Sequence, residues 1–239
     1  MTESEITTDS CSNQQRHYLE RNVGIELAIL CVLMCTSFLD IEMNVRVGNM
    51  HITTWNPQSN PLVLSGLALV FLLLSGSLRK IGFRFKYSFR GYLWRTGLLT
   101  AMLILVDVIT SLLTSLLGLT ENYSAFKQIS ESPFLTLFLI FIFFPVFAFL
   151  EEFYFRGYLI QRFETLLGNR KAAPTYAVVI SSVLFGLVHW HAGPIAAVGH
   201  TFSGLVLALI YVAGGRNIWL PSFVHYLVNI MALIINFSK

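Results

Sequence analysis

The sequence predicts an all-α fold: a polytopic transmembrane helical bundle of about seven spans, within a range of six to eight. Three observations predict it. Hydrophobic residues make up 55% of the 239 residues and charged residues only 12%, whereas a soluble domain carries roughly 25% charged residues. The mean hydropathy is +0.66, and 20 Phe are spread over long apolar runs. This composition excludes a disordered chain, a secreted disulfide scaffold and a nucleic-acid-binding protein.

A spanning helix needs about 20 mostly apolar residues. Such segments occur, in chain order, at 23–39, 61–78, 97–119, 134–150 or beyond, 174–191, 195–213 and 218–237. Residues 1–22 are polar and have no apolar core ahead of a cleavage site, so we expect a polar cytoplasmic tail rather than a cleaved signal peptide. No internal repeat is present, which disfavours an inverted-repeat transporter.

The distribution of basic residues predicts the orientation. Thirteen of the 16 Lys and Arg residues fall in the tail and in the segments 79–96, 151–173 and 214–217, all on one side of the predicted spans. Arg46, Lys127 and Lys239 fall on the other side. Cytoplasmic loops carry an excess of Lys and Arg. We therefore expect a multi-pass protein of the cell membrane with a cytoplasmic N-terminus.

The same pattern suggests two regions. Residues 23–133 form an N-terminal transmembrane region of three spans, with the basic cytoplasmic loop 79–96 between two of them. That loop, SLRKIGFRFKYSFRGYLWR with its flanks, combines cations with aromatic residues, and we expect it to lie on anionic headgroups. Residues 134–239 form a core of four spans.

Ionisable residues inside spans are costly and usually face the bundle interior or a water-filled cavity, so they mark candidate sites. In FLEEFYFRGYL, Glu152 and Arg156 are four residues apart and share a helix face, where they can form an ion pair. Glu151 points about 100° away from Glu152 and is the carboxylate left to act as a general base. The structural alternative is a salt bridge at the cytoplasmic end of a helix.

Two later spans carry similar pairs. Phe185 and His189 share a face in SSVLFGLVHWHAG, and His225 and Asn229 share a face in LPSFVHYLVNI. His189 has the alternative of being a hydrogen-bonded core residue. His225 and Asn229 have the alternative of joining neighbouring helices by hydrogen bonds.

Together the three segments contain the parts of a hydrolytic site. Glu151 would take a proton from water, and His189 would hold that water and pass the proton to a leaving amine. His225 and Asn229 would donate to the developing oxyanion, an interaction that typically contributes about 10²–10³ in rate.

Two histidines and two glutamates could bind zinc, which accepts nitrogen and oxygen ligands. If a metal is bound, its ligands would be Glu151, His189 and His225. The HExxH pattern is absent from the sequence, and Asn229 is a poor zinc ligand but a good oxyanion donor. The residues therefore favour a mechanism without a metal, with zinc as the alternative.

In order along the chain, EExxxR at Glu151–Arg156, FxxxH at Phe185–His189 and HxxxN at His225–Asn229 resemble the motifs of the CPBP (Abi) family. That family comprises type II CAAX prenyl endopeptidases and bacteriocin-processing enzymes. The resemblance covers about residues 134–237. It implies an intramembrane endopeptidase made of helices, described both as a metalloprotease and as a glutamate-type enzyme.

By motif position the resemblance implies roles for seven residues. Glu151 is the catalytic base and His189 the second catalytic residue. The remaining positions are the oxyanion pair His225 and Asn229 and the supporting residues Glu152, Arg156 and Phe185. The expected partners are a peptide or membrane-protein substrate and the lipid bilayer, with no nucleic acid.

Two other functions remain open at this point. One is a non-catalytic membrane scaffold, or an immunity or regulatory protein, on the same fold. The other is a proton-coupled transporter that uses Asp107 and the glutamate pair. Asp107 lies mid-span and is expected to pair with Arg95 or another helix, or to hydrate a cavity, whereas Glu26 is expected near the membrane interface. His191 and His200 flank a Gly–Pro turn that fixes no shared face, which disfavours a metal site there.

The predicted spans place the candidate site residues at different distances from the inner side of the membrane. His189 would lie about 22 Å along its helix from the inner side and His225 only about 10 Å along its own. For both to meet Glu151, the helices must tilt or the fourth helix must continue well past residue 150, with Pro145 as the place for a kink.

Overall fold

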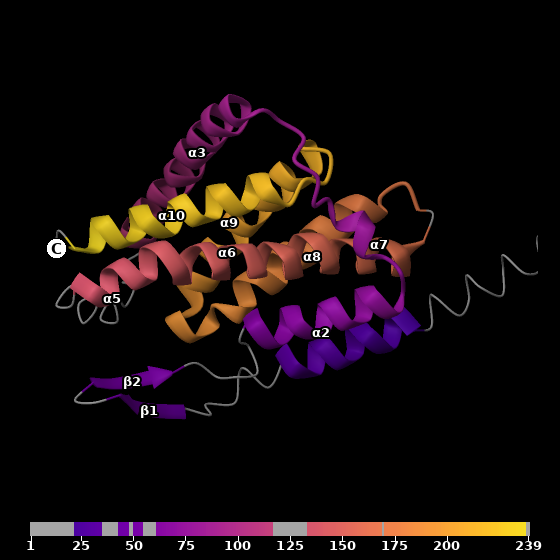
Figure 1. Cartoon of the computed structure of the whole chain (residues 1–239), viewed down its shortest axis with the longest axis horizontal. Coiled ribbons are helices and arrows are strands. Elements are labelled where there is room, and N and C mark those ends of the chain that lie inside the picture. The colour runs from indigo at the N-terminus through magenta and orange to yellow at the C-terminus, as the bar shows by residue number, and fades with distance from the viewer. Residues whose placement is uncertain are drawn as a thin grey trace, which may run out of the picture.

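The computed structural model describes residues 22–34, 43–47, 50–54, 61–116, 133–168 and 170–237. Over these residues the chain is a bundle of apolar helices (Figure 1), which confirms the predicted helical bundle. The predicted tail, residues 1–22, lies outside the described residues except for its last position.

The helices follow one another in chain order with short turns between most of them. They are Asn22–Met34, α2 (Pro61–Leu74), the short η2 (Leu78–Ile81), α3 (Phe89–Leu116), α5 (Pro133–Phe138), η3 (Leu139–Phe143), α6 (Phe144–Glu152), η4 (Phe153–Leu159), α7 (Ile160–Leu167), α8 (Ala173–Val188), η5 (Trp190–Ala192), α9 (Pro194–Ala213) and α10 (Trp219–Phe237).

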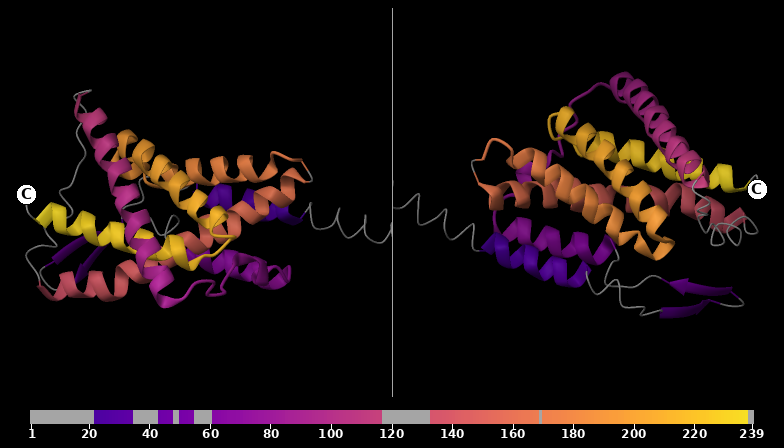
Figure 2. Two further views of the ribbon diagram at one scale, coloured as in Figure 1. Left: turned by 90° about the horizontal axis from the view of Figure 1, so that it is seen from above. Right: turned by 180° about the vertical axis from the view of Figure 1, so that it is seen from behind.

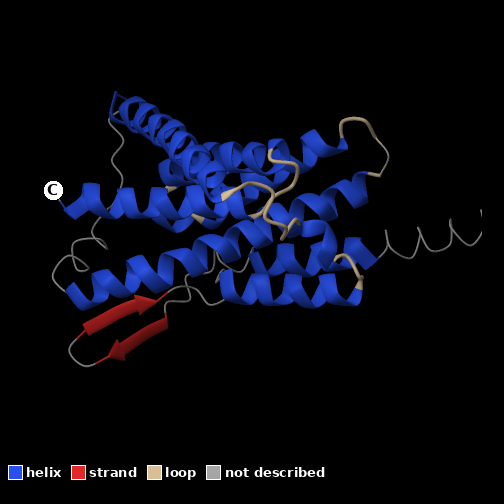
Figure 3. Cartoon of the chain, turned by 45° about the horizontal axis from the view of Figure 1, so that its top comes forward, coloured by secondary structure: helices blue, strands red, loops and turns tan. Residues whose placement is uncertain are grey.

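A two-stranded hairpin was not predicted. Strands β1 (Met43–Val47) and β2 (Met50–Thr54) pair antiparallel, with Val47 opposite Met50. In Figure 3 this hairpin is drawn beside the helices and not among them. The sequence 43–54 alternates polar and apolar residues too briefly to stand out against the long apolar runs around it.

The fourth predicted span, given above as 134–150 or beyond, extends well past residue 150. Elements α5 to α7 form one continuous helical run, Pro133–Leu167, which is one of the two alternatives given above. The wider π-helical turn η3 lies just before Pro145, where the proline cannot donate the usual hydrogen bond. The expected loop at 151–173 was therefore wrong over most of its length, because Arg156 and Arg162 are buried helical residues and not loop cations.

By length and composition, three of the described helical segments can cross a membrane: Phe89–Leu112, Pro133–Leu167 and Pro194–Ala213. Four shorter apolar helices accompany them: Asn22–Met34, Leu62–Leu74, Ala173–Val188 and Trp219–Ile235. Helix α3 begins at Phe89 instead of residue 97, so the last part of the expected basic loop is helical. Seen from above, α3 crosses over α10 (Figure 2).

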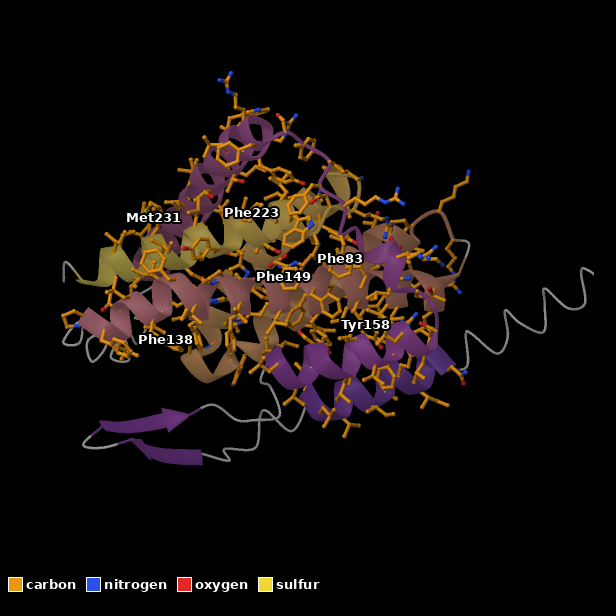
Figure 4. The ribbon with its side chains drawn as sticks, in the orientation of Figure 1. Phe83, Phe138, Phe149, Tyr158, Phe223 and Met231 are labelled. Carbon is orange, nitrogen blue, oxygen red and sulfur yellow. The ribbon has the colours of Figure 1, made fainter. Side chains whose placement is uncertain are left out.

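The N-terminal helices are held to the Pro133–Leu167 run by a buried polar network. The guanidinium Nε of Arg162 lies 2.8 Å from Glu26 Oε2, and Nη2 donates to Ser75 Oγ on the turn after α2. Tyr158, whose side chain is directed toward α2 in Figure 4, donates to the same Glu26 oxygen at 3.0 Å. Glu26, 12% exposed, is thus an ion-pair and hydrogen-bond partner of this helical run.

Asp107 joins α3 to another helix, as one of the expected alternatives had it. Its Oδ1 accepts a hydrogen bond of 2.8 Å from Ser203 on α9. Arg95, the other suggested partner, instead donates to Gly91 O and lies over the Tyr87 ring. A side-chain hydrogen bond between two apolar helices stabilises their contact inside the bilayer.

Helices α8 and α9 pack closely against each other, and Gly186 allows this approach. A Cβ at this position would lie 1.9 Å from Thr201 Oγ1 and 2.3 Å from Ala197 O. The second atom belongs to the backbone of α9, so it cannot move without moving the helix.

We expect Gly186→Ala to destabilise the protein by about 3 kcal/mol, the upper end for an overpacked core, because a backbone atom blocks the new methyl group. Thermal unfolding of the detergent-purified protein measures this. Gly66→Ala on α2 is the matched control, since a Cβ there meets nothing within 4 Å. Equal melting temperatures for the two variants would contradict the packing described here.

Candidate active site

Glu152 is the most deeply buried member of the candidate site. It ends α6, and the π-helical turn η4 begins at the next residue. Such turns widen a helix and occur frequently at functional sites. Its carboxylate is 0% exposed, and Oε1 accepts hydrogen bonds of 2.9 Å from both Arg156 Nη1 and His225 Nδ1. The ion pair with Arg156 that the spacing predicted is thus present.

His225 lies between the two glutamates. Its Nδ1 donates to Glu152, and its Nε2 lies 3.6 Å from Glu151 Oε2. A histidine whose Nδ1–H is held by a carboxylate has a fixed ring orientation and a fixed tautomer when neutral. Sequence spacing gave no sign of the contact with Glu152, because it joins residues 73 positions apart on α6 and α10.

Arg156 connects this cluster to α9 and α8. Its Nη2 donates to Gly204 O at 3.1 Å, and its guanidinium carbon lies 4.4 Å from the centre of the Phe185 ring. Gly204 permits this approach, because a Cβ there would lie 2.9 Å from Phe185 Cδ1. The contact combines a charge-assisted hydrogen bond with a cation–π interaction in a buried site.

Phe185 separates the two histidines of the motifs. Its ring centre lies 4.9 Å from that of His189 and 5.9 Å from that of His225. His189 Nδ1 donates to Phe185 O at 2.8 Å, so the lone pair of a neutral His189 ring is on Nε2. His189 therefore lies beside the Glu–Arg–His225 cluster across an aromatic ring.

His200 is a neighbour that the sequence did not assign to the site. Its ring stacks on that of His189, with centres 3.9 Å apart and planes at 13°, and its Nδ1 donates to Ala196 O. The turn at Gly193 and Pro194 brings the start of α9 back against the end of α8, and residue spacing could not have shown where that turn leads.

Asn229 lies one helical turn beyond His225 on α10, about 6 Å along the axis, and is half-buried. Within the described residues no hydrogen bond joins it to the other motif residues. The structure therefore brings Glu151, Glu152, Arg156 and His225 into one cluster and leaves Asn229 at its edge.

The long helical run determines where along a helix the cluster lies. Glu151 lies about 27 Å from Pro133 and about 24 Å from Leu167 along the helix, which is near its midpoint. The carboxylates are therefore deep within a helix long enough to cross a bilayer. Two buried atoms of the cluster, Glu152 Oε2 and Arg156 Nε, have no hydrogen-bond partner among the described residues, and a water molecule beside them would supply one.

The described residues do not gather a set of metal ligands. No group of three or more His, Cys, Asp or Glu side chains within them could hold a metal ion. Of the three ligands considered from the sequence, Glu151 approaches His225, whereas His189 packs on the Phe185 ring. Within the part of the chain that the structure describes, Glu151, His189 and His225 therefore do not converge as three ligands of one zinc ion.

Comparison with known proteins identifies the region that carries the motifs. Residues 132–231 match the family described as type II CAAX prenyl endopeptidase Rce1-like. No curated protein and no solved structure matches the chain. The matched residues run from the start of the Pro133–Leu167 helix through Asn229, and so include every side chain of the cluster. The match agrees with the resemblance to the CPBP family, and the apolar helices make the chain a membrane protein: its residues 132–231 are similar to the type II CAAX prenyl endopeptidase Rce1-like family.

Proposed function

We propose that the protein is an intramembrane endopeptidase in which Glu151 activates the attacking water. The main observation behind the proposal is that the carboxylates of Glu152 and Glu151 face the two ring nitrogens of His225. Both glutamates lie near the midpoint of the helix Pro133–Leu167, which is long enough to span a membrane. The Rce1-like match supports protease activity in the membrane. The assignment of individual roles rests on the geometry.

Charge in the cluster supports this assignment. With a neutral His225, the side chains of Glu151, Glu152 and Arg156 sum to one negative charge. One further proton on His225 Nε2, which lies 3.6 Å from Glu151 Oε2, brings the sum to zero, and buried charges are tolerated when they are paired and hydrogen-bonded. His225 can then donate from Nε2 while Glu151 accepts a proton.

The steps follow from these contacts. Glu151 takes a proton from a water molecule, and the water oxygen attacks the carbonyl carbon of the scissile peptide bond. His225, held by Glu152, donates from Nε2 to the developing oxyanion, and Asn229 adds a second donor from the next turn. His189 Nε2 takes this proton from Glu151 and delivers it to the amide nitrogen as the C–N bond breaks and the oxyanion becomes part of the new carboxyl group, while Arg156 holds Glu152 in place.

We further propose a multi-pass arrangement in the cell membrane with the N-terminus on the cytoplasmic side. The basic residues Arg79, Lys80, Arg84, Arg170 and Lys171 are all exposed. They lie in the turns that follow α2 and α7, and cytoplasmic turns are enriched in such cations. The substrate is then a peptide segment that enters the bilayer.

Membrane peptide profiling tests the function in cells that contain the natural substrate, whatever its sequence. Cells carrying the wild type and cells carrying Glu151→Gln are compared at equal membrane levels of the protein. We expect cleaved membrane peptides that are present with the wild type and missing with the variant. Identical peptide sets would reject protease activity, and a phenotype that survives the substitution would point to a scaffold.

Asn229→Ala tests the oxyanion assignment. We expect kcat for the identified substrate to fall by about 10²–10³ with little change in KM, because an oxyanion donor acts in the transition state. The half-buried position makes a large loss of stability unexpected, and Asn229→Asp, which cannot donate from the side chain when ionised, should be equally impaired. A wild-type kcat for Asn229→Ala would remove this residue from the mechanism.

Chelation tests the metal-free mechanism. We expect 1,10-phenanthroline to inhibit the purified protein no more than its non-chelating isomer 1,7-phenanthroline, and we expect zinc well below one equivalent per chain. Selective inhibition by the chelator, reversed by added zinc, would contradict the mechanism.

A further inference from the structure

The segment between α2 and α3, residues 78–88, is tied to the turn between α9 and α10, and we call it the strap. Four consecutive carbonyl oxygens of the strap accept hydrogen bonds from that turn and from the adjoining ends of α9 and α10. The pairs are Ile81 O with Tyr211 Oη, Gly82 O with Ile218 N, Phe83 O with Trp219 Nε1, and Arg84 O with Asn217 Nδ2. The backbone of the strap therefore faces the bundle.

Gly82 makes this close approach possible. Its φ is +89°, and a Cβ there would lie 1.6 Å from Arg216 O. Lys86 continues the attachment by donating from Nζ to the carbonyl oxygens of Gly214 and Gly215. The strap is thus a fixed surface, held at both ends by helices and across its middle by hydrogen bonds.

The outer face of the strap is cationic. Arg79, Lys80 and Arg84 are exposed and have no ion-pair partner among the described residues. At the same end of the bundle, Glu164 is paired with Arg216 at 2.6 Å, and this hydrogen bond raises the pKa of Arg216. No acidic residue occurs between residues 78 and 95, so the charge of this face is not neutralised within it.

Large apolar side chains accompany these cations. Phe85 is 64% exposed, Phe89 82% and Trp94 56%. Phe83, next to Phe149 in Figure 4, packs with its ring centre 6.4 Å from that of Phe149 and 6.1 Å from that of Phe153. Exposed aromatic rings beside cations at the end of spanning helices are typical of the headgroup region of a bilayer.

We infer that the strap is a docking surface for the headgroups of anionic phospholipids. Its charge complements a phosphate-bearing headgroup, and the exposed rings of Phe85 on the strap and of Phe89 and Trp94 at the start of α3 suit the boundary between headgroups and acyl chains. Each basic residue near an anionic surface contributes about fivefold to binding. The inference does not depend on the proposed proteolysis, because it concerns lipid binding alone.

Quenching of Trp94 by brominated lipids tests the inference. The full chain is reconstituted in phosphatidylcholine bilayers containing increasing brominated phosphatidylglycerol, and Trp94 emission is taken as the difference from Trp94→Phe. We expect brominated phosphatidylglycerol to quench Trp94 at much lower mole fractions than brominated phosphatidylcholine. We expect Arg79→Gln with Lys80→Gln to raise the half-quenching mole fraction by about tenfold or more.

The matched control is Arg170→Gln with Lys171→Gln, which removes an exposed Arg–Lys pair from the turn between α7 and α8. We expect this variant to keep the wild-type half-quenching mole fraction. Equal effects of the two double variants would assign the binding to overall charge and overturn the inference. Equal quenching of the wild type by the two brominated lipids would overturn it too.

Discussion

Glu151→Gln should abolish cleavage, with kcat lowered by about 10⁴, the upper end for loss of a general base. Gln keeps the size and shape of the side chain but cannot take a proton from water. The contact of Glu151 with His225 is 3.6 Å long, longer than a hydrogen bond, and Gln keeps the packing of the side chain, so we expect a small loss of stability beside the loss of activity. Kinetics on the identified substrate and thermal unfolding in detergent measure the two effects.

Glu151→Asp is the matched control for charge. It retains a carboxylate but withdraws it from the imidazole by about one methylene length, so we expect partial activity. A Glu151→Gln variant that cleaves as fast as the wild type would exclude Glu151 as the base. A variant that unfolds at a much lower temperature would instead assign the residue a structural role.

Arg156→Met should lower both stability and activity. It removes a side chain that is 1% exposed and leaves Glu152 buried without its cation. Breaking a buried ion pair by removal of one partner typically costs about 3–5 kcal/mol. The orientation of His225 depends on Glu152, so we expect kcat to fall even in the protein that remains folded.

Two comparisons give this prediction a sharper form. Arg156→Lys keeps the charge but cannot reach Glu152 and Gly204 O together with a planar fork, so it should restore part of the stability and little of the activity. Combining Arg156→Met with Glu152→Gln removes the uncompensated charge and should recover stability without recovering catalysis. A double variant no more stable than Arg156→Met would show that the ion pair is not the reason for the loss.

Local spacing predicted the parts of the site that lie on one helix. The Glu152–Arg156 ion pair and the Phe185–His189 contact both follow from a four-residue separation. The continuation of the fourth helix past residue 150 was one of two expected ways in which Glu151 could meet the histidines, and the helix does continue to Leu167.

Contacts between helices could not be predicted in the same way. The hydrogen bond from His225 to Glu152, the stack of His200 on His189 and the pairing of Glu26 with Arg162 join residues brought together by turns and crossing angles. Periodicity fixes which face of a helix a residue occupies, but not which neighbour that face meets. The count of Lys and Arg residues in loops wrongly included Arg156 and Arg162 for a related reason. A buried, paired cation gives no information about which side of the membrane a loop faces.

The central claim is that this bundle holds a water molecule at Glu151 and uses it to hydrolyse a peptide bond. The most direct measurement is cleavage of the identified substrate in H₂¹⁸O by the reconstituted wild type and by Glu151→Gln, followed by mass spectrometry of the products. We predict that the wild type releases a peptide whose new carboxyl terminus carries one ¹⁸O, and that Glu151→Gln releases none. Labelled product formed at the same rate by both proteins, or no labelled carboxyl terminus with either, would contradict the account.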